Sequence, residues 1–234
     1  GLDGGWGLVE SVGGMAGAAV VASGWSSLEA SGLWKIALFI VFSPLIGLAL
    51  GMILTTVIMW CSHRYRNVAR LNKGFRRGQL VSAAAFSLGH GGNDAQKTMG
   101  IILAVLIATN HVSADAAVPT WVVLSAHTAI ALGTMFGGWK IVKTMGSKIT
   151  KLQPVGGMAA ESAAAATLFA TSAAGIPVST THTISGAIVG VGSSRRLSAV
   201  RWGVASQVVW AWVLTIPGAF AIAAVAMLVV QGFN

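Results

Sequence analysis

The sequence is poor in the residues that stabilise soluble or secreted domains. One cysteine, Cys61, stands among 234 residues, which excludes a disulfide framework and a cysteine metal cluster. Only 9% of the residues are charged, whereas soluble domains carry about 25%. Acidic residues are the scarcest, with 6 Asp and Glu against 15 Lys and Arg. These shortages exclude an ordinary soluble domain.

Long apolar segments make up most of the remainder. Hydrophobic residues account for 55% of the chain, and the mean hydropathy is +0.76. A membrane-spanning helix needs roughly 20 apolar residues, so the chain has room for about seven crossings. The segments are continuous rather than alternating, which favours helices over a barrel. We predict an all-α, polytopic transmembrane bundle with elements at 4–24, 33–60, 79–110, 118–139, 154–175, 177–192 and 202–230.

The basic residues gather in the stretches 62–78 and 140–151. Such clusters mark cytoplasmic loops of membrane proteins. This placement explains the net charge of +9 through the lipid bilayer and argues against nucleic acid as a partner. We expect an integral protein of the plasma membrane, which is the inner membrane in a bacterium.

The first polar motif begins at His90 inside the apolar element 79–110. Asp94 and Lys97 lie there at a depth where a charge costs about 2.5 to 3.5 kcal/mol. Neighbouring glycines predict an interrupted helix whose backbone is free to bind a ligand: Gly89, Gly91 and Gly92. Asn93 and Asp94 offer hard oxygen ligands for Na⁺ or a carboxylate for H⁺. In the alternative, Asp94 and Lys97 neutralise each other across one helical turn.

The second polar motif runs from Pro177 to His182. Its hydroxyls, Ser179, Thr180 and Thr181, follow a proline as at a helix N-terminus, where unpaired N–H groups favour an anion. The alternative is ordinary capping and hydrogen bonding between helices. The element 177–192 is short for a full crossing, which leaves a hairpin or an interrupted helix equally open.

The two ends of the chain share a spacing pattern. The differences 186 − 13, 190 − 17 and 217 − 44 all equal 173, which aligns Gly13, Gly17 and Pro44 with Gly186, Gly190 and Pro217. The loop after the first copy carries Glu29 and the loop after the second carries three arginines, as an inverted-topology repeat predicts. We therefore divide the chain into the tail of a first repeat (1–61), a basic cytoplasmic linker (62–78) and a second repeat (79–234).

The sequence pattern around the second motif disfavours an intramembrane hydrolase. The sequence has no G-x-S-x-G elbow, and Ser179 and His182 are too close in sequence to indicate a nucleophile and its base. We expect no enzyme activity and no cofactor.

At its two motifs the sequence resembles the inorganic phosphate transporter (PiT) family. Gly91-Gly92-Asn93-Asp94 is similar to that family's G-x-N-D signature, and Pro177-Val178-Ser179-Thr180-Thr181-His182 to its P-x-S-T-T-H signature. The family carries each signature in both of two inverted halves. The resemblance runs from about Val12 to Val230, and no first G-x-N-D is present. It therefore implies the C-terminal half plus the tail of the N-terminal half.

The resemblance implies symport of inorganic phosphate with Na⁺ or H⁺ by alternating access. Asn93 and Asp94 would be cation ligands, with no metal site beyond a Na⁺ there, and the phosphate ligands would be Ser179, Thr180 and Thr181. Second candidates are Gln96, Lys97, His90 and His182. The alternatives are a sulfate permease of the same architecture and a membrane assembly protein that does not transport. Association into a homo-oligomer stays open.

Overall fold

The computed structural model describes residues 7–137 and 145–232, and every element in these ranges is helical. The predicted all-α class is confirmed. In chain order the elements are α1 (Gly7–Ser23), η1 (Trp25–Ser27), α2 (Ala30–Ser62), α3 (Val68–Ala108), α4 (Thr120–Gly137), η2 (Met145–Ile149), α6 (Pro154–Ala173), α7 (Thr180–Arg195), η3 (Leu197–Ala199) and α8 (Trp202–Gly232).

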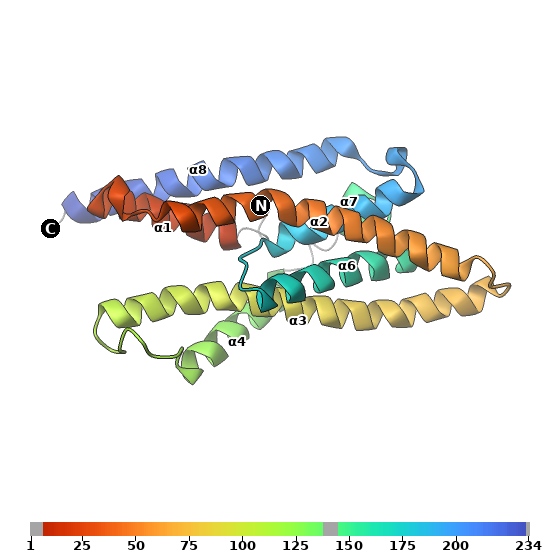
Figure 1. Ribbon diagram of the computed structural model, residues 1–234, viewed down its shortest axis with the longest axis horizontal. Helices are drawn as coiled ribbons and strands as arrows, with labels where there is room; N and C mark the ends of the chain where they lie inside the picture. Colours follow the sequence, from red (N-terminus) through yellow and green to blue (C-terminus); the bar gives the residue numbers. More distant parts are fainter. Residues whose placement is uncertain (1–6, 138–144, 233–234) are drawn as a thin grey trace.

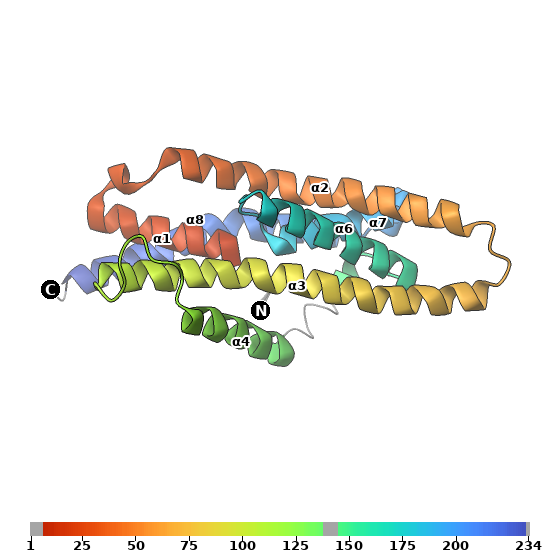
Figure 2. The same ribbon diagram turned by 60° about the horizontal axis from the view of Figure 1, so that its bottom comes forward.

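Two long antiparallel helices, α2 and α3, form the frame of the molecule (Figure 1). They are joined by the short turn 63–67, and at 1.5 Å per residue α3 is about 62 Å long. Helices α6 and α7 lie along the halves of α2 and α3 that adjoin this turn (Figure 2). Helix α7 packs on α2 and α6 packs on α3. The frame therefore encloses α6 and α7 on one half of its length.

Helices α6 and α7, predicted as the separate elements 154–175 and 177–192, pack together as a hairpin, whereas the sequence left a hairpin open only within 177–192. The turn 174–179 joins them, and they pack on each other. Gly175 takes a φ of 64° in this turn, a conformation that favours glycine. Pro154 starts α6 at a position where its missing N–H costs nothing. The hairpin carries the second motif at its tip, where α7 begins.

Glycines bring α2 and α7 into backbone contact. A Cβ atom built on Gly186 or Gly190 of α7 would meet the carbonyl oxygen of Pro44 or Leu48 on α2. From the other side, a Cβ on Gly51 would lie 2.5 Å from the carbonyl oxygen of Ala187. Small residues allow such close approach between membrane helices. This contact fixes how far α7 extends along α2.

Helices α1 and α8 form a second pair, which lies side by side in both views (Figures 1 and 2). Gly13 and Gly17 of α1 face the carbonyl oxygens of Ile216 and Phe220 on α8. Helix α4 packs separately on α3, through a small core of Ala95, Met99, Val122 and Ala126. The glycine-mediated contact is thus used in both major helix pairs.

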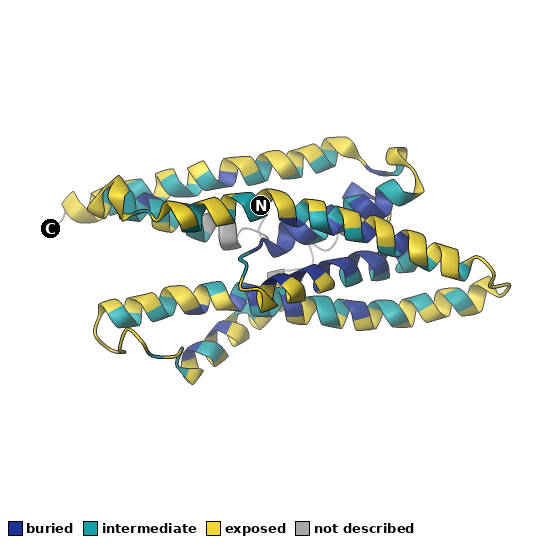
Figure 3. Ribbon diagram, in the orientation of Figure 1, coloured by how far each residue is buried: buried dark blue, intermediate teal, exposed yellow. Residues whose placement is uncertain are grey.

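Burial concentrates in the α6–α7 hairpin, whereas the outer faces of α2, α3 and α8 are exposed (Figure 3). The exposed side chains on these faces are largely apolar and include Trp34, Leu88, Trp210 and Ile222. By length and composition, α2 and α8 are able to cross a membrane. An apolar exterior around a more polar hairpin is the arrangement that a bilayer requires.

The predicted interruption at the first motif is wrong, because α3 continues through it as one α-helix. A glycine within a helix costs only about 1 kcal/mol relative to alanine, so it does not by itself end one. Gly89 instead lets α6 approach: a Cβ atom there would lie 3.4 Å from Leu168 Cβ and 3.7 Å from the Phe169 ring. The backbone of α3 therefore keeps its helical hydrogen bonds beside Asp94.

The first basic stretch, 62–78, is largely helical, contrary to the predicted start of the next element at 79. Helix α3 begins at Val68, with Asn67 as its N-cap: the Asn67 side chain accepts a hydrogen bond of 3.0 Å from the N–H of Arg70. A strong cap and good helix formers extend α3 beyond its apolar part. In the second stretch, Lys140 and Lys143 lie outside the described residues.

The α2–α7 contact makes a stability prediction. Gly186→Ala places a methyl group against the Pro44 carbonyl, and we expect it to lower the free energy of unfolding by about 1 to 3 kcal/mol. Gly100→Ala is the matched control, because its Cβ would meet nothing within 4 Å and helix propensity favours alanine. Thermal unfolding of the full-length protein in detergent measures both. Equal midpoints for the two variants would contradict the contact.

Candidate functional site

The first motif places its charges along one face of α3. Asp94 is the centre: Lys97 Nζ lies 2.8 Å from its Oδ1, and His90 Nε2 lies 3.2 Å from its Oδ2. These pairs follow from the spacings i, i+3 and i, i+4, which bring side chains together on a helix. The ion pair that the alternative interpretation expected is thus formed. Asp94 keeps 26% of its side chain exposed, so the carboxylate remains accessible.

Asn93 is buried beside this face. Its side-chain nitrogen donates a 2.8 Å hydrogen bond to the carbonyl oxygen of Gly89, one turn earlier on α3. The amide oxygen, rather than the nitrogen, is therefore the atom that a cation would take. Gln96 lies elsewhere, on an exposed part of α3.

The second motif forms the N-terminus of α7. Ser179 is the N-cap, and its hydroxyl accepts a 3.4 Å hydrogen bond from the N–H of His182. Thr180 and Thr181 occupy the first turn, and all four side chains are buried. The capping role predicted by the alternative is real for Ser179. It does not account for Thr180, whose hydroxyl points away from its own helix.

The two motifs meet at Thr180 and Asp94. The Thr180 hydroxyl lies 3.4 Å from Asp94 Oδ1 and 3.5 Å from Oδ2, across 86 residues of sequence. The tip of the hairpin thus donates to the carboxylate in the middle of α3. Hydroxyl, carboxylate, ammonium and imidazole groups gather around one point of the frame.

His182 takes a different position from the one its motif suggests. Its Nδ1 donates to the Ile40 carbonyl oxygen at 3.4 Å, and its ring stacks on Trp212 with 3.8 Å between centroids. Pro44 has no N–H, so it leaves the Ile40 carbonyl without its usual helical donor. His182 satisfies that carbonyl and links α7 to α2 and α8.

Two hydroxyls outside the motifs were missed by the sequence interpretation, those of Ser82 and Ser43. Ser82 of α3 donates a 2.6 Å hydrogen bond to the Glu161 carboxylate on α6. The hydroxyl of Ser43 and Nδ1 of His90 are buried without a hydrogen-bond partner in the described part of the chain. For the contact between His182 and the Ile40 carbonyl, the available signal was Pro44 inside an apolar span, because a proline there frees a carbonyl that another helix must satisfy.

Both signatures fall within a larger match. Residues 62–223 match the family described as "Phosphate transporter family". The chain belongs to this family. The resemblance to PiT proteins drawn from the two motifs is confirmed, and the family is one of transporters rather than of enzymes. The family and the apolar helices together identify this phosphate transporter family member as an integral membrane protein.

Individual proteins similar to this family member carry descriptions that agree with the family match. A probable low-affinity inorganic phosphate transporter of Rhizobium meliloti (strain 1021) is 54% identical over 213 residues, covering 91% of the chain and 64% of the relative. A protein of the same description from Bacillus subtilis (strain 168) is 44% identical over 221 residues, covering 94% and 66%. The chain thus spans just under two thirds of the length of each.

A solved structure has the same fold. It is described as the sodium-dependent phosphate transporter, and it superposes with a TM-score of 0.83 at 24% identity, covering 97% of the chain and 74% of that structure. At this identity the match establishes the fold.

The Ser82–Glu161 contact makes a second stability prediction. Ser82→Ala removes a donor from a carboxylate between α3 and α6, and we expect the free energy of unfolding to fall by about 1 to 3 kcal/mol. Ser125→Ala is the control, because its hydroxyl bonds only to the Val122 carbonyl of its own helix. Thermal unfolding in detergent compares the two. The contact would be unimportant if both variants unfolded at the wild-type temperature.

Proposed function

We propose that the protein of which this chain is part carries inorganic phosphate across the membrane together with Na⁺ or H⁺. The observation that carries the proposal is the contact between Thr180 and Asp94, which joins the hydroxyl-rich helix start to the carboxylate. Two relatives bear the description of low-affinity inorganic phosphate transporters. The name of the structural neighbour makes Na⁺ the first cation to test.

Phosphate would bind at the start of α7. Ser179, Thr180 and Thr181 supply hydroxyls in a buried setting, and the N-terminal N–H groups of α7 add the positive end of its dipole. Lys97 is held within reach of the same point through Asp94. An anion there would find donors and a nearby cation.

The cation would bind at Asp94 and Asn93. Lys97 already occupies Asp94 Oδ1 at 2.8 Å, so an incoming cation competes with it for that oxygen. Displaced from Asp94, the Lys97 ammonium becomes available to a phosphate at Thr180. Cation and anion would thus favour each other's binding, which is the requirement for symport. His90 holds the other carboxylate oxygen, whereas Gln96 lies on an exposed part of α3 and His182 holds α7 against α2 and α8.

An inverted repeat supports alternating access. Gly13 faces the carbonyl of Ile216, and Gly186, its partner at the 173-residue offset, faces that of Pro44, whose own partner is Pro217. Each repeat's glycine helix therefore packs on the proline-containing helix of the other: α1 on α8, and α7 on α2. This reciprocal pattern is what a pseudo-two-fold axis produces.

The remaining parts of the proposal concern organisation. Residues 1–61 would be the tail of the first repeat, 62–78 a cytoplasmic linker and 79–234 the second repeat, in the plasma membrane. By analogy with the family, the first half of the whole protein would carry another copy of both signatures, and the complete site would be formed by both halves. Self-association into an oligomer is compatible with the exposed apolar faces.

Asp94→Asn tests the cation site. Loss of the charged ligand should reduce the initial rate of cation-driven phosphate uptake by at least about tenfold, because hydrogen bonds to charged groups contribute about 1.5 to 3 kcal/mol. Uptake of labelled phosphate by proteoliposomes with the full-length protein measures this. Asp115→Asn, in an exposed loop, is the control. Unchanged uptake and cation dependence in Asp94→Asn would refute the cation site.

Thr180→Val tests the phosphate site. It removes the hydroxyl but keeps the shape, so we expect the phosphate concentration for half-maximal uptake to rise about fivefold or more, whereas Thr180→Ser should remain near wild type. The same assay with excess sulfate shows which anion the protein transports.

Sulfate that abolishes phosphate uptake would favour a sulfate permease. Absence of uptake of either anion by the wild-type protein would favour an assembly protein.

A further inference from the structure

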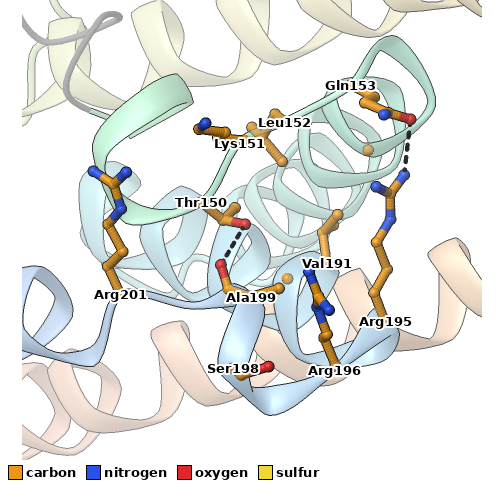
Figure 4. Close-up of a pocket in the computed structure, with 12 residues that line it drawn as sticks. Thr150, Lys151, Leu152, Gln153, Val191, Arg195, Arg196, Ser198, Ala199 and Arg201 are labelled. Carbon is orange, nitrogen blue, oxygen red and sulfur yellow. Dashed lines mark hydrogen bonds between the residues drawn. The ribbon is translucent and has the colours of Figure 1, made fainter.

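A second polar site lies at the other end of the hairpin from the motif. Here a cavity of about 370 Å³ opens between the segment 150–153 and the segment 195–201. We call it the basic cavity, after its charged lining residues Lys151, Arg195, Arg196 and Arg201 (Figure 4). Its volume falls within the range of small-molecule sites, about 300 to 1,000 Å³.

Hydrogen bonds hold the walls of the basic cavity together. The Thr150 hydroxyl donates to the Ala199 carbonyl at 3.1 Å, and the backbone N–H of Arg201 donates to the Ile149 carbonyl at 2.9 Å. Gly192 forms part of the floor, where a Cβ would lie 2.7 Å from Val200 and 3.2 Å from the Thr150 hydroxyl. The two segments that line the cavity are therefore held in place by hydrogen bonds and by close packing at Gly192.

The charge of the basic cavity is uncompensated. Among its lining residues there is no Asp or Glu, and the ion pairs of the described ranges 7–137 and 145–232 all involve Asp94. Arg195 donates to the Gln153 side-chain oxygen at 3.4 Å, a neutral partner. Figure 4 shows Arg201 on one side and Arg195 on the other, with Thr150 and Ala199 between them.

Helix capping does not account for this charge. The C-terminus of α7 at Arg195 supplies about half a negative charge, and the N-terminus of α6, which enters the lining at Gln153 and Gly156, supplies about half a positive one. The two helix ends nearly cancel. Four exposed cations therefore face one cavity without a protein partner of opposite charge in the described ranges.

We propose that the basic cavity binds a phosphoryl anion, either the headgroup of an anionic lipid or a soluble phosphate. Arginine matches phosphate oxygens with paired N–H donors, and three arginines surround this cavity. Arg195 is fifteen residues from Thr180 along α7, about 22 Å. The basic cavity is therefore separate from the proposed transport site.

A bound anion would join three elements. Lys151 precedes α6, Arg195 ends α7, and Arg201 precedes α8. One phosphoryl group held by all three would clamp the root of the hairpin whose tip carries Thr180. The basic cavity would thus adjust how firmly the hairpin is seated.

The test uses the full-length protein, purified in detergent and stripped of lipid, with the thermal unfolding midpoint measured against ligand concentration. One arm adds phosphatidylglycerol with phosphatidylcholine as the neutral control. The other adds glycerol 3-phosphate, with sodium chloride at the same ionic strength as its control. Stabilisation by phosphatidylglycerol alone identifies a lipid headgroup, and stabilisation by glycerol 3-phosphate identifies a soluble phosphate.

Charge-removing variants locate the effect. In the triple variant Arg195→Gln, Arg196→Gln, Arg201→Gln, the apparent affinity should fall about tenfold or more, because charge-assisted hydrogen bonds are lost. The triple variant Arg64→Gln, Arg66→Gln, Arg70→Gln removes equal charge from the turn after α2 and the first turn of α3, and it should respond as wild type. For Arg196→Gln alone, the apparent affinity should fall about fivefold. The Arg196 side chain is exposed, so this single variant covers the case that the triple variant does not fold.

The overturning results are equally definite. The proposal fails if the cavity variants keep the wild-type response to both ligands. It fails too if the variant at Arg64, Arg66 and Arg70 loses as much apparent affinity as the cavity variants do. It also fails if neither anion stabilises the wild-type protein above its control. Phosphate uptake does not enter these measurements, so their outcome is independent of the transport proposal.

Discussion

The backbone contact between α2 and α7 determines where the polar groups of this protein lie. Inside a bilayer the hydrophobic effect gives helices no reason to associate, so close packing and hydrogen bonds must hold them together. Glycines on both helices remove the side chains that would separate the backbones. Their four-residue spacing fixes the register of α7 on α2, and this register sets the depth at which Thr180 meets Asp94. A shift of one helical turn would move Thr180 about 5.4 Å from the carboxylate.

Local helix geometry explains the two alternative interpretations of the motifs that the structure bears out. The Asp94–Lys97 pair follows from a spacing of three on a helix, and the capping role of Ser179 follows from hydroxyls after a proline. The 173-residue offset selected the glycines that lie at backbone contacts. Local geometry and recurring spacing are properties of the chain itself, so they are visible without a fold.

Other features depend on neighbours that are distant in sequence. Gly89 was interpreted as a helix break, yet its lack of a side chain makes room for Leu168 and Phe169 of α6. The Ser82–Glu161 bond spans 79 residues and could not be inferred from either residue alone. The basic cavity combines residues from several elements, and in the sequence its arginines indicated only the side of the membrane. Burial and tertiary pairing therefore mark the limit of sequence interpretation here.

The Asp94–Lys97 pair has an electrical consequence. In the proposed cycle, the unloaded site carries a carboxylate and an ammonium only 2.8 Å apart, so their charges sum to zero. Moving one net elementary charge through 100 mV changes the free energy by about 2.3 kcal/mol. This chain's half of the empty site would therefore add no net charge to the movement of the carrier. Through these groups, the membrane potential would act on the carrier only when a cation or a phosphate is bound.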